Sequence, residues 1–148
     1  MILRAALVLL LVAFAPAAFA KTCKVAIGSN DAMQFDTAEI KIAGDCTKVE
    51  LTLKHTGKMP VTAMGHNWVL AKTADVRALA IAGQRAHAAD GYLPKDDARI
   101  IAHTRLVGGG ESTTVAFATT GLRKGGDYTF FCSFPGHWTL MQGKLVFG

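Results

Sequence analysis

The sequence predicts an all-β sandwich or barrel with Greek-key connections. Several short segments alternate apolar and polar residues with the period of a half-buried strand, and turn signals separate them. The chain has 148 residues, which is enough for one hydrophobic core. The sequence shows no internal repeat, linker or low-complexity segment, so we expect residues 21–148 to form a single domain.

The clearest strand signal lies in residues 48–54. Val49, Leu51 and Leu53 fall on one face of this segment, and charged or polar residues fall on the other. Strict alternation of this kind predicts a strand with one face buried. The predicted strands are residues 25–27, 39–42, 48–54, 67–70, 113–118, 128–132 and 144–147.

One segment between the strands does not fit the strand pattern. Residues 73–89 are rich in alanine, contain few β-branched residues, and begin with Thr73 and Asp75 as possible caps. They predict one or two helical turns inserted into the β fold. The triple glycine at residues 108–110 lacks the strand-then-helix context of a phosphate-binding loop, so we interpret it as a hairpin turn.

Residues 1–20 have the pattern of a secretory signal peptide. The charged residue Arg4 precedes an apolar run that continues through Ala15, and the segment ends in Ala18-Phe19-Ala20. We expect cleavage after about Ala20 and export of the remaining chain. No later run reaches the roughly 20 apolar residues that a bilayer span needs, so no membrane span is expected in the mature chain.

The charge pattern argues against nucleic acid as a partner. The formal net charge of the chain is +5, and the signal peptide carries one of the positive charges. Arg123-Lys124 is the only pair of neighbouring basic residues, so the sequence has no basic tract that could follow a phosphate backbone.

The chain has three cysteines, and an odd number cannot all pair within one chain. Export leads to an oxidising compartment, where cysteines tend to form disulfides. The economical interpretation is a Cys23–Cys46 disulfide that leaves Cys132 over. A leftover thiol in that compartment is a hazard unless it is buried or bound to something.

Three potential metal ligands fall within ten residues near the C-terminus: Cys132, His137 and Met141. They follow the predicted strand at residues 128–132, and Pro135-Gly136 between them favours a tight loop over a helix. Thiolate, imidazole and thioether form a soft ligand set. Methionine is acceptable to copper and poor for zinc, calcium or magnesium, so the set predicts copper.

A trigonal copper site needs a second histidine, and His66 has the best sequence context. Gly65 would allow the backbone to approach a metal and even offer its carbonyl. Asn67 could join two loops by hydrogen bonds near the thiolate. We interpret His55 as a structural residue near His66; the remaining two histidines, His87 and His103, are expected in loops or on the surface.

These features run through most of the chain after residue 20. They are Cys23, Cys46, Met141 and the segments 31–35, 64–70, 101–104 and 130–137. With them, the sequence resembles the cupredoxin family of type 1 copper proteins. The resemblance implies a Greek-key β-barrel of about eight strands with a short inserted helix.

The resemblance also implies a ligand set with no member missing. One copper ion would be held by His66, Cys132 and His137, with Met141 and the Gly65 carbonyl as weak axial partners. The residues expected around these ligands are Asn67, Ser133 and Phe134.

The function implied by the resemblance is one-electron transport in the periplasm by a monomer that is not an enzyme. Expected partners are redox proteins such as c-type cytochromes, or copper-containing or amine-oxidising periplasmic enzymes. They would contact an apolar patch around the edge of the His137 ring. The expected patch residues are Met33, Met59, Met64, Phe134, Pro135, Trp138 and Leu140.

Two other functions compete with electron transport. Cys132 and His137 could be the nucleophile and base of a hydrolase, or parts of a copper oxidoreductase. Both residues lie on one short loop, however, and no third group is evident to orient the base. Copper storage or delivery could use nearly the same ligands, and such a pocket would also accept zinc.

Overall fold

The computed structural model describes residues 20–148, so all but the last residue of the predicted signal peptide lies outside the described residues. None of the helices in the described part is long and apolar enough to cross a membrane. The strands of this part are β1 (Thr22–Asn30), β2 (Gln34–Phe35), β3 (Glu39–Ile42), β4 (Lys48–His55), β5 (Val69–Lys72), β6 (Ile100–His103), β7 (Ser112–Ala118), β8 (Tyr128–Phe131) and β9 (Gln142–Phe147).

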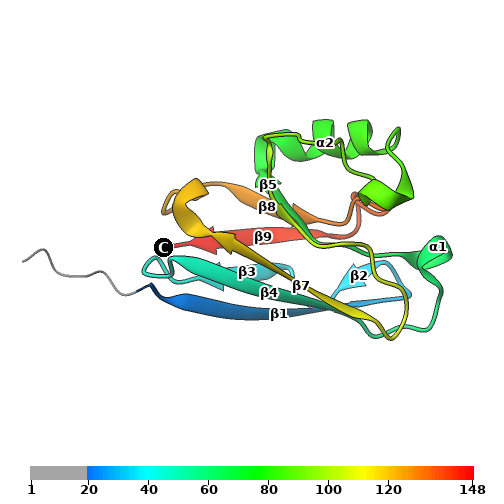
Figure 1. Ribbon diagram of the computed structural model, residues 1–148, viewed down its shortest axis with the longest axis horizontal. Helices are drawn as coiled ribbons and strands as arrows, with labels where there is room; N and C mark the ends of the chain where they lie inside the picture. The colour runs from blue at the N-terminus through cyan, green and yellow to red at the C-terminus, as the bar shows by residue number, and fades with distance from the viewer. Residues whose placement is uncertain (1–19) are drawn as a thin grey trace, which may run out of the picture.

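The strands form two sheets that pack face to face (Figure 1). One has the order β2-β1-β4-β7 and the other the order β3-β9-β8-β5-β6. Two pairs, β1 with β4 and β3 with β9, are parallel, and the other pairs are antiparallel. The predicted all-β sandwich is therefore confirmed.

The alternating pattern of β4 explains how the core is filled. Val49, Leu51 and Leu53 are each 0% exposed and face the second sheet, as predicted. The strand-period pattern thus places every second residue of β4 in the core. Other members of this core include Ile27, Trp68, Leu70, Phe117, Phe130 and Leu145.

β6 was not predicted from the sequence, because this strand lacks clean alternation. Ile100 and Ile101 are neighbours and point to opposite faces of the sheet. Ile101 packs against the core between the sheets, and Ile100 packs against a second cluster on the outer face. β6 thus contacts apolar groups on both faces, which explains why its residues do not alternate between apolar and polar.

The predicted helical insertion is present on the outer side of the five-stranded sheet (Figure 1). The 3-10 turn η1 (Thr73–Asp75) leads into α2 (Val76–Gly83), and a second short turn, η2 (Ala88–Asp90), follows. The buried residues of α2 have the spacing of one helix face and contact the outer face of the sheet. They are Val76, Leu79, Ala80 and Gly83.

The register of β5 and β8 places the candidate ligands at one end of the sandwich. Val69 lies opposite Phe131 in this antiparallel pair. Continuing the register beyond the strand ends brings Asn67 beside Ser133, with His66 and Cys132 close by. Figure 1 shows α1 (Val61–Met64) and the β8–β9 connection at the end of the molecule away from the C-terminus.

The predicted Cys23–Cys46 disulfide is present and joins residues 23 positions apart in the sequence. Cys23 lies on β1, and Cys46 lies just before β4. The disulfide therefore fixes the two parallel strands at the end of the sandwich away from the candidate ligands, and Cys132 is left free and buried.

Removing this disulfide should destabilise the fold without altering the candidate site. Replacing Cys23 and Cys46 together by serine should lower the free energy of unfolding by about 3 kcal/mol, because the unfolded chain regains the freedom of the closed loop. Urea unfolding measures this change. Lys21→Ala, which removes a nearby exposed ion pair with Asp45, is the control and should leave the midpoint almost unchanged. An unchanged unfolding midpoint in the double variant would show that the Cys23–Cys46 disulfide does not stabilise the fold.

Candidate metal centre

Three side-chain donor atoms meet at the end of the sandwich. They belong to His66, Cys132 and His137, and all of them lie within 4.8 Å of one another. The Cys132 sulfur is 3.8 Å from Nδ1 of each histidine and 4.0 Å from the Gly65 carbonyl oxygen. Cys132 and His66 are 0% exposed and His137 is 4% exposed. The structure thus brings together the residues that the sequence singled out.

The connection between β8 and β9 is a tight loop that returns to its starting point. The Cys132 amide donates to the Met141 carbonyl at 3.0 Å, and the Met141 amide donates to the His137 carbonyl at 2.8 Å. Gly136 has φ +83°, a left-handed conformation that glycine adopts without strain. This loop buries Met141 completely beside Cys132 and Phe134.

Hydrogen bonds fix both the position and the tautomer of His66. Its backbone exchanges two hydrogen bonds with Val107, at 3.0 and 2.8 Å. Its Nε2 lies 2.8 Å from the Asn30 carbonyl oxygen. A carbonyl oxygen can only accept, so Nε2 carries the proton and the lone pair of Nδ1 points toward Cys132 and His137.

Gly65 must be glycine because its neighbours leave no room for a side chain. A Cβ atom at this position would lie 2.5 Å from the Val61 carbonyl oxygen and 3.0 Å from the Phe134 ring. The missing side chain lets the end of α1 approach Phe134, and it also places the Gly65 carbonyl near the Cys132 sulfur.

Asn67 joins the two loops that carry the candidate ligands. Its amide nitrogen donates to the Ser133 hydroxyl at 2.8 Å and to the Gly91 carbonyl at 3.0 Å. Its amide oxygen accepts from the Ser133 backbone at 2.9 Å. Asn67 and Ser133 are both buried, so these bonds replace those that water would have made.

His55 lies directly behind His66, as the sequence analysis expected. The two rings stack with centroids 4.5 Å apart. His55 Nδ1 accepts from the Gly57 amide, and Nε2 donates to the Met64 carbonyl, each at 3.0 Å. The ring therefore supports His66 and ties it to the loop after β4. His87 and His103 are exposed and are not part of the donor cluster.

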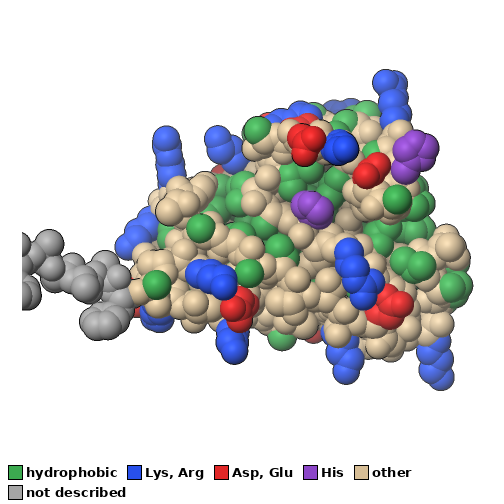
Figure 2. Space-filling model, viewed as in Figure 1, with side chains coloured by type: hydrophobic (Ala, Val, Ile, Leu, Met, Phe, Trp, Pro, Cys, Tyr) green, Lys and Arg blue, Asp and Glu red, His purple; other side chains and the backbone are tan. Residues whose placement is uncertain are grey.

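The residues expected to form the apolar patch have different environments. Leu140 is 67% exposed and Met59 is 39% exposed. Pro135 is also exposed, whereas Met33 and Met64 are partly buried and Phe134 is buried. Trp138 is partly buried and packs against the apolar cluster on the outer face of the five-stranded sheet, which includes residues of α2 and β5. In Figure 2 the Lys and Arg side chains are dispersed over the visible face.

Comparison with known proteins agrees with this geometry. Residues 21–148 match the family model described as copper binding proteins, plastocyanin/azurin family. The chain belongs to the plastocyanin/azurin family.

Individual members of the family cover most of this chain. An azurin of Bordetella pertussis is 48% identical over 136 residues, which are 92% of this chain and 91% of that protein. An azurin of Alcaligenes faecalis is 47% identical over 85% of this chain and 98% of its own length. Among solved structures, the azurin Az-iso2 from Methylomonas sp. strain J superposes with a TM-score of 0.82. It is 42% identical, and the match covers 85% of this chain and 98% of that one.

The donor set of this plastocyanin/azurin family member fits copper. Burial lowers the pKa of His66 to about 4 and also lowers that of His137, so both imidazoles are neutral and can donate lone pairs. Burial raises the pKa of the Cys132 thiol to about 11. A buried thiolate therefore needs a cation beside it, and a soft sulfur with two imidazoles suits copper.

Metal binding should release one proton per ion at pH 7. The Cys132 thiol is protonated at that pH and the two histidines are not, so only the thiol must lose a proton. The apparent affinity for Zn²⁺ should rise about tenfold per pH unit between about pH 6 and pH 9. An indicator dye in weak buffer measures the proton. Cys132→Ser should release none; equal release by that variant would refute the assignment.

Gly65→Ala should weaken metal binding. The added methyl group must displace Phe134 or the end of α1. This would disturb His66, because His66 is the next residue in the chain. Chelator competition should show an affinity about 10- to 100-fold lower, as is typical when the support of a ligand is disturbed. Gly121→Ala is the matched control, because a Cβ at Gly121 meets no atom within 4 Å. Equal affinities in the two variants would contradict the role of Gly65.

Proposed function

We propose that the mature chain is a periplasmic one-electron carrier containing a single type 1 copper. His66, Cys132 and His137 would hold the ion as its main ligands, and Met141 and the Gly65 carbonyl would be weaker donors. One observation carries the proposal: a thiol, two imidazoles and a thioether are gathered where none of these four side chains is more than 4% exposed. Residues 1–20 are proposed as the signal peptide, and residues 21–148 as one domain.

The buried ligand set favours a carrier over an enzyme. Copper, when bound, supplies a one-electron couple between Cu(II) and Cu(I). The protein contributes donors fixed by hydrogen bonds and packing, and a His₂Cys set with long axial contacts is tolerable to both oxidation states. A metalloenzyme normally keeps an open coordination position for substrate or water, and the enclosure of all four side chains disfavours one.

The surface next to His137 is the proposed point of electron exchange. The exposed residues Pro135 and Leu140 flank His137 on the same loop, and Met59 is exposed on the loop after β4. An apolar surface of this kind suits a small, short-lived interface. The proposed partners are redox proteins such as c-type cytochromes or copper-containing or amine-oxidising periplasmic enzymes. We propose that the carrier itself is a monomer.

The visible absorption spectrum tests this function. After addition of Cu(II), the mature protein should show a strong blue thiolate-to-copper band. The band should bleach with a reductant and return with ferricyanide, and the bound copper should exchange slowly with a chelator. A colourless adduct would show that Cys132 is not a ligand, and rapid exchange with the chelator would favour copper delivery.

Removing the imidazole of His137 should open the site to added ligands. In copper-loaded His137→Gly the intensity and position of the blue band should change, because one of the strong ligands is lost. Exogenous imidazole should then restore the parent spectrum. His103→Gly is the control, since His103 is exposed and lies outside the donor cluster. A His137→Gly variant that keeps the parent spectrum and excludes imidazole would show that His137 is not a ligand.

A charge placed on the proposed patch should slow electron exchange. Leu140→Asp adds a carboxylate to an apolar contact surface that must lose water when a partner docks. The rate of electron self-exchange should fall by about tenfold or more, while the blue band is unchanged. Ile81→Asp is the matched control, because Ile81 is 47% exposed on α2. Equal slowing by both variants would show that the exchange surface is not specific to Leu140.

A further inference from the structure

We propose that Gly91 and Tyr92 are positioning residues for the metal centre. They lie in the segment between α2 and β6, outside both of the loops that carry the candidate ligands. The inference rests on the proposed function in one respect only, because it takes Cys132 and His137 as ligands. The segment acts as a third support, through a backbone carbonyl at Gly91 and an aromatic ring at Tyr92.

The carbonyl oxygen of Gly91 holds the Asn67–Ser133 pair in place. It accepts a hydrogen bond from the Ser133 hydroxyl at 2.6 Å and one from the Asn67 amide at 3.0 Å. Ser133 directly follows Cys132 in the chain. Gly91 is buried, so water cannot replace its carbonyl as the acceptor for these two donors if the carbonyl moves away. The carbonyl thereby fixes the residues next to the Cys132 ligand.

The ring of Tyr92 supports the other end of the same loop. It meets the Phe134 ring edge to face, with centroids 5.3 Å apart and an interplanar angle of 79°. Phe134 in turn lies against the His137 ring, with centroids 4.6 Å apart. An edge-to-face aromatic contact is directional, so Tyr92 limits the motion of Phe134 and, through it, that of His137.

The backbone places these two groups through an uncommon conformation. Gly91 has φ +67° and Tyr92 has φ +53°, so two successive residues are left-handed. This conformation is readily available to glycine but unfavourable for tyrosine, and it persists only where the surroundings fix it. The Tyr92 amide donates to the His87 carbonyl at 3.2 Å, and its own carbonyl packs against Gly83 of α2. The support is therefore anchored in α2.

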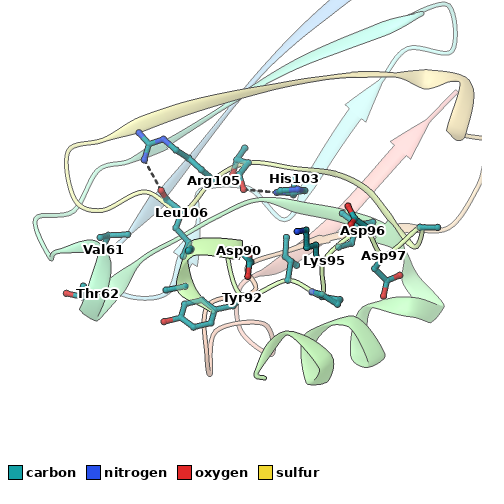
Figure 3. Close-up of a pocket in the computed structure, with 18 residues that line it drawn as sticks. Val61, Thr62, Asp90, Tyr92, Lys95, Asp96, Asp97, His103, Arg105 and Leu106 are labelled. Carbon is teal, nitrogen blue, oxygen red and sulfur yellow. Dashed lines mark hydrogen bonds between the residues drawn. The ribbon is translucent and has the colours of Figure 1, made fainter. Parts of the chain in front are cut away.

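Tyr92 also lines a groove. Figure 3 shows the ring among the residues that line a cavity of about 920 Å³ between the segment 88–98 and β6. Phe134 does not line this groove; it is 8% exposed, and its ring contacts that of Tyr92. Loss of the Tyr92 ring would therefore remove a side chain that lines the groove and contacts Phe134.

The test compares Tyr92→Ala with two matched controls. In the copper-loaded chain, Tyr92→Ala should release metal to a chelator about 10- to 100-fold faster than the parent and shift the thiolate-to-copper band. In the metal-free chain, a disulfide reagent should label Cys132 about tenfold faster, because the loop opens locally more often. Tyr92→Phe keeps the ring and should match the parent. Leu93→Ala removes a buried side chain from the neighbouring α2 cluster and should also match it.

Equal metal release and equal labelling in Tyr92→Ala and Leu93→Ala would overturn the proposal, since loss of stability alone would then explain both. If Tyr92→Ala fails to fold, Tyr92→Leu keeps apolar bulk without the aromatic edge and should show the same two effects in smaller measure. Parent-like behaviour of Tyr92→Leu would then count against the proposal. Labelling of the metal-free chain and release of the bound metal to a chelator do not depend on electron transport. A failure of this proposal can therefore be distinguished from a failure of the proposed function.

Discussion

The hydrogen bonds between Asn67 and Ser133 are the constraint on which the metal centre depends. His66 and Cys132 lie on different loops, and neither loop contains a complete ligand set. The register of β5 and β8 brings the two loops side by side, and the buried amide of Asn67 then joins them at 2.8 and 2.9 Å. Such bonds in a dry environment are costly to break, because the separated groups would be left without partners. We therefore expect the folded chain to hold the donor geometry without help from the metal.

Burial explains why this arrangement suits a metal ion better than a catalytic nucleophile. The Cys132 thiol, enclosed among Phe134, Met141 and the two histidines, has a raised pKa of about 11 and would be a poor nucleophile at neutral pH. The same burial keeps the imidazoles neutral by lowering their pKa values. A cation that displaces the thiol proton would compensate the buried negative charge, and it would meet the Nδ1 lone pair of His66, whose tautomer the Asn30 carbonyl sets. The enclosure that disfavours catalysis thereby favours a tightly held, redox-active ion.

Local sequence signals were enough to predict the donor residues that the structure brings together, and most strands. Cys132, His137 and Met141 are close in sequence, and their residue types restrict the metal; the alternation in β4 likewise depends only on neighbouring residues. Contacts between distant segments carry no such signal. No sequence pattern indicates that the Asn30 carbonyl sets the tautomer of His66 or that the Gly91 carbonyl accepts from Ser133, because backbone atoms have no side-chain signature. Trp138 was expected in the exposed patch because it follows His137; it is partly buried and packs against a cluster that includes α2 residues distant in the sequence.

Crystal structures of residues 21–148 without metal and with copper would show whether the fold holds the donors in place before the metal arrives. We expect His66, Cys132 and His137 to keep their side-chain conformations, with the donor atoms moving by less than about 0.5 Å, the tolerance of a preorganised site. The Nε2–Asn30 and Asn67–Ser133 hydrogen bonds should be present in both. A rotated His66 ring, or a Cys132–His137 loop that becomes ordered only with copper, would contradict a preformed site and show that the metal assembles its own site.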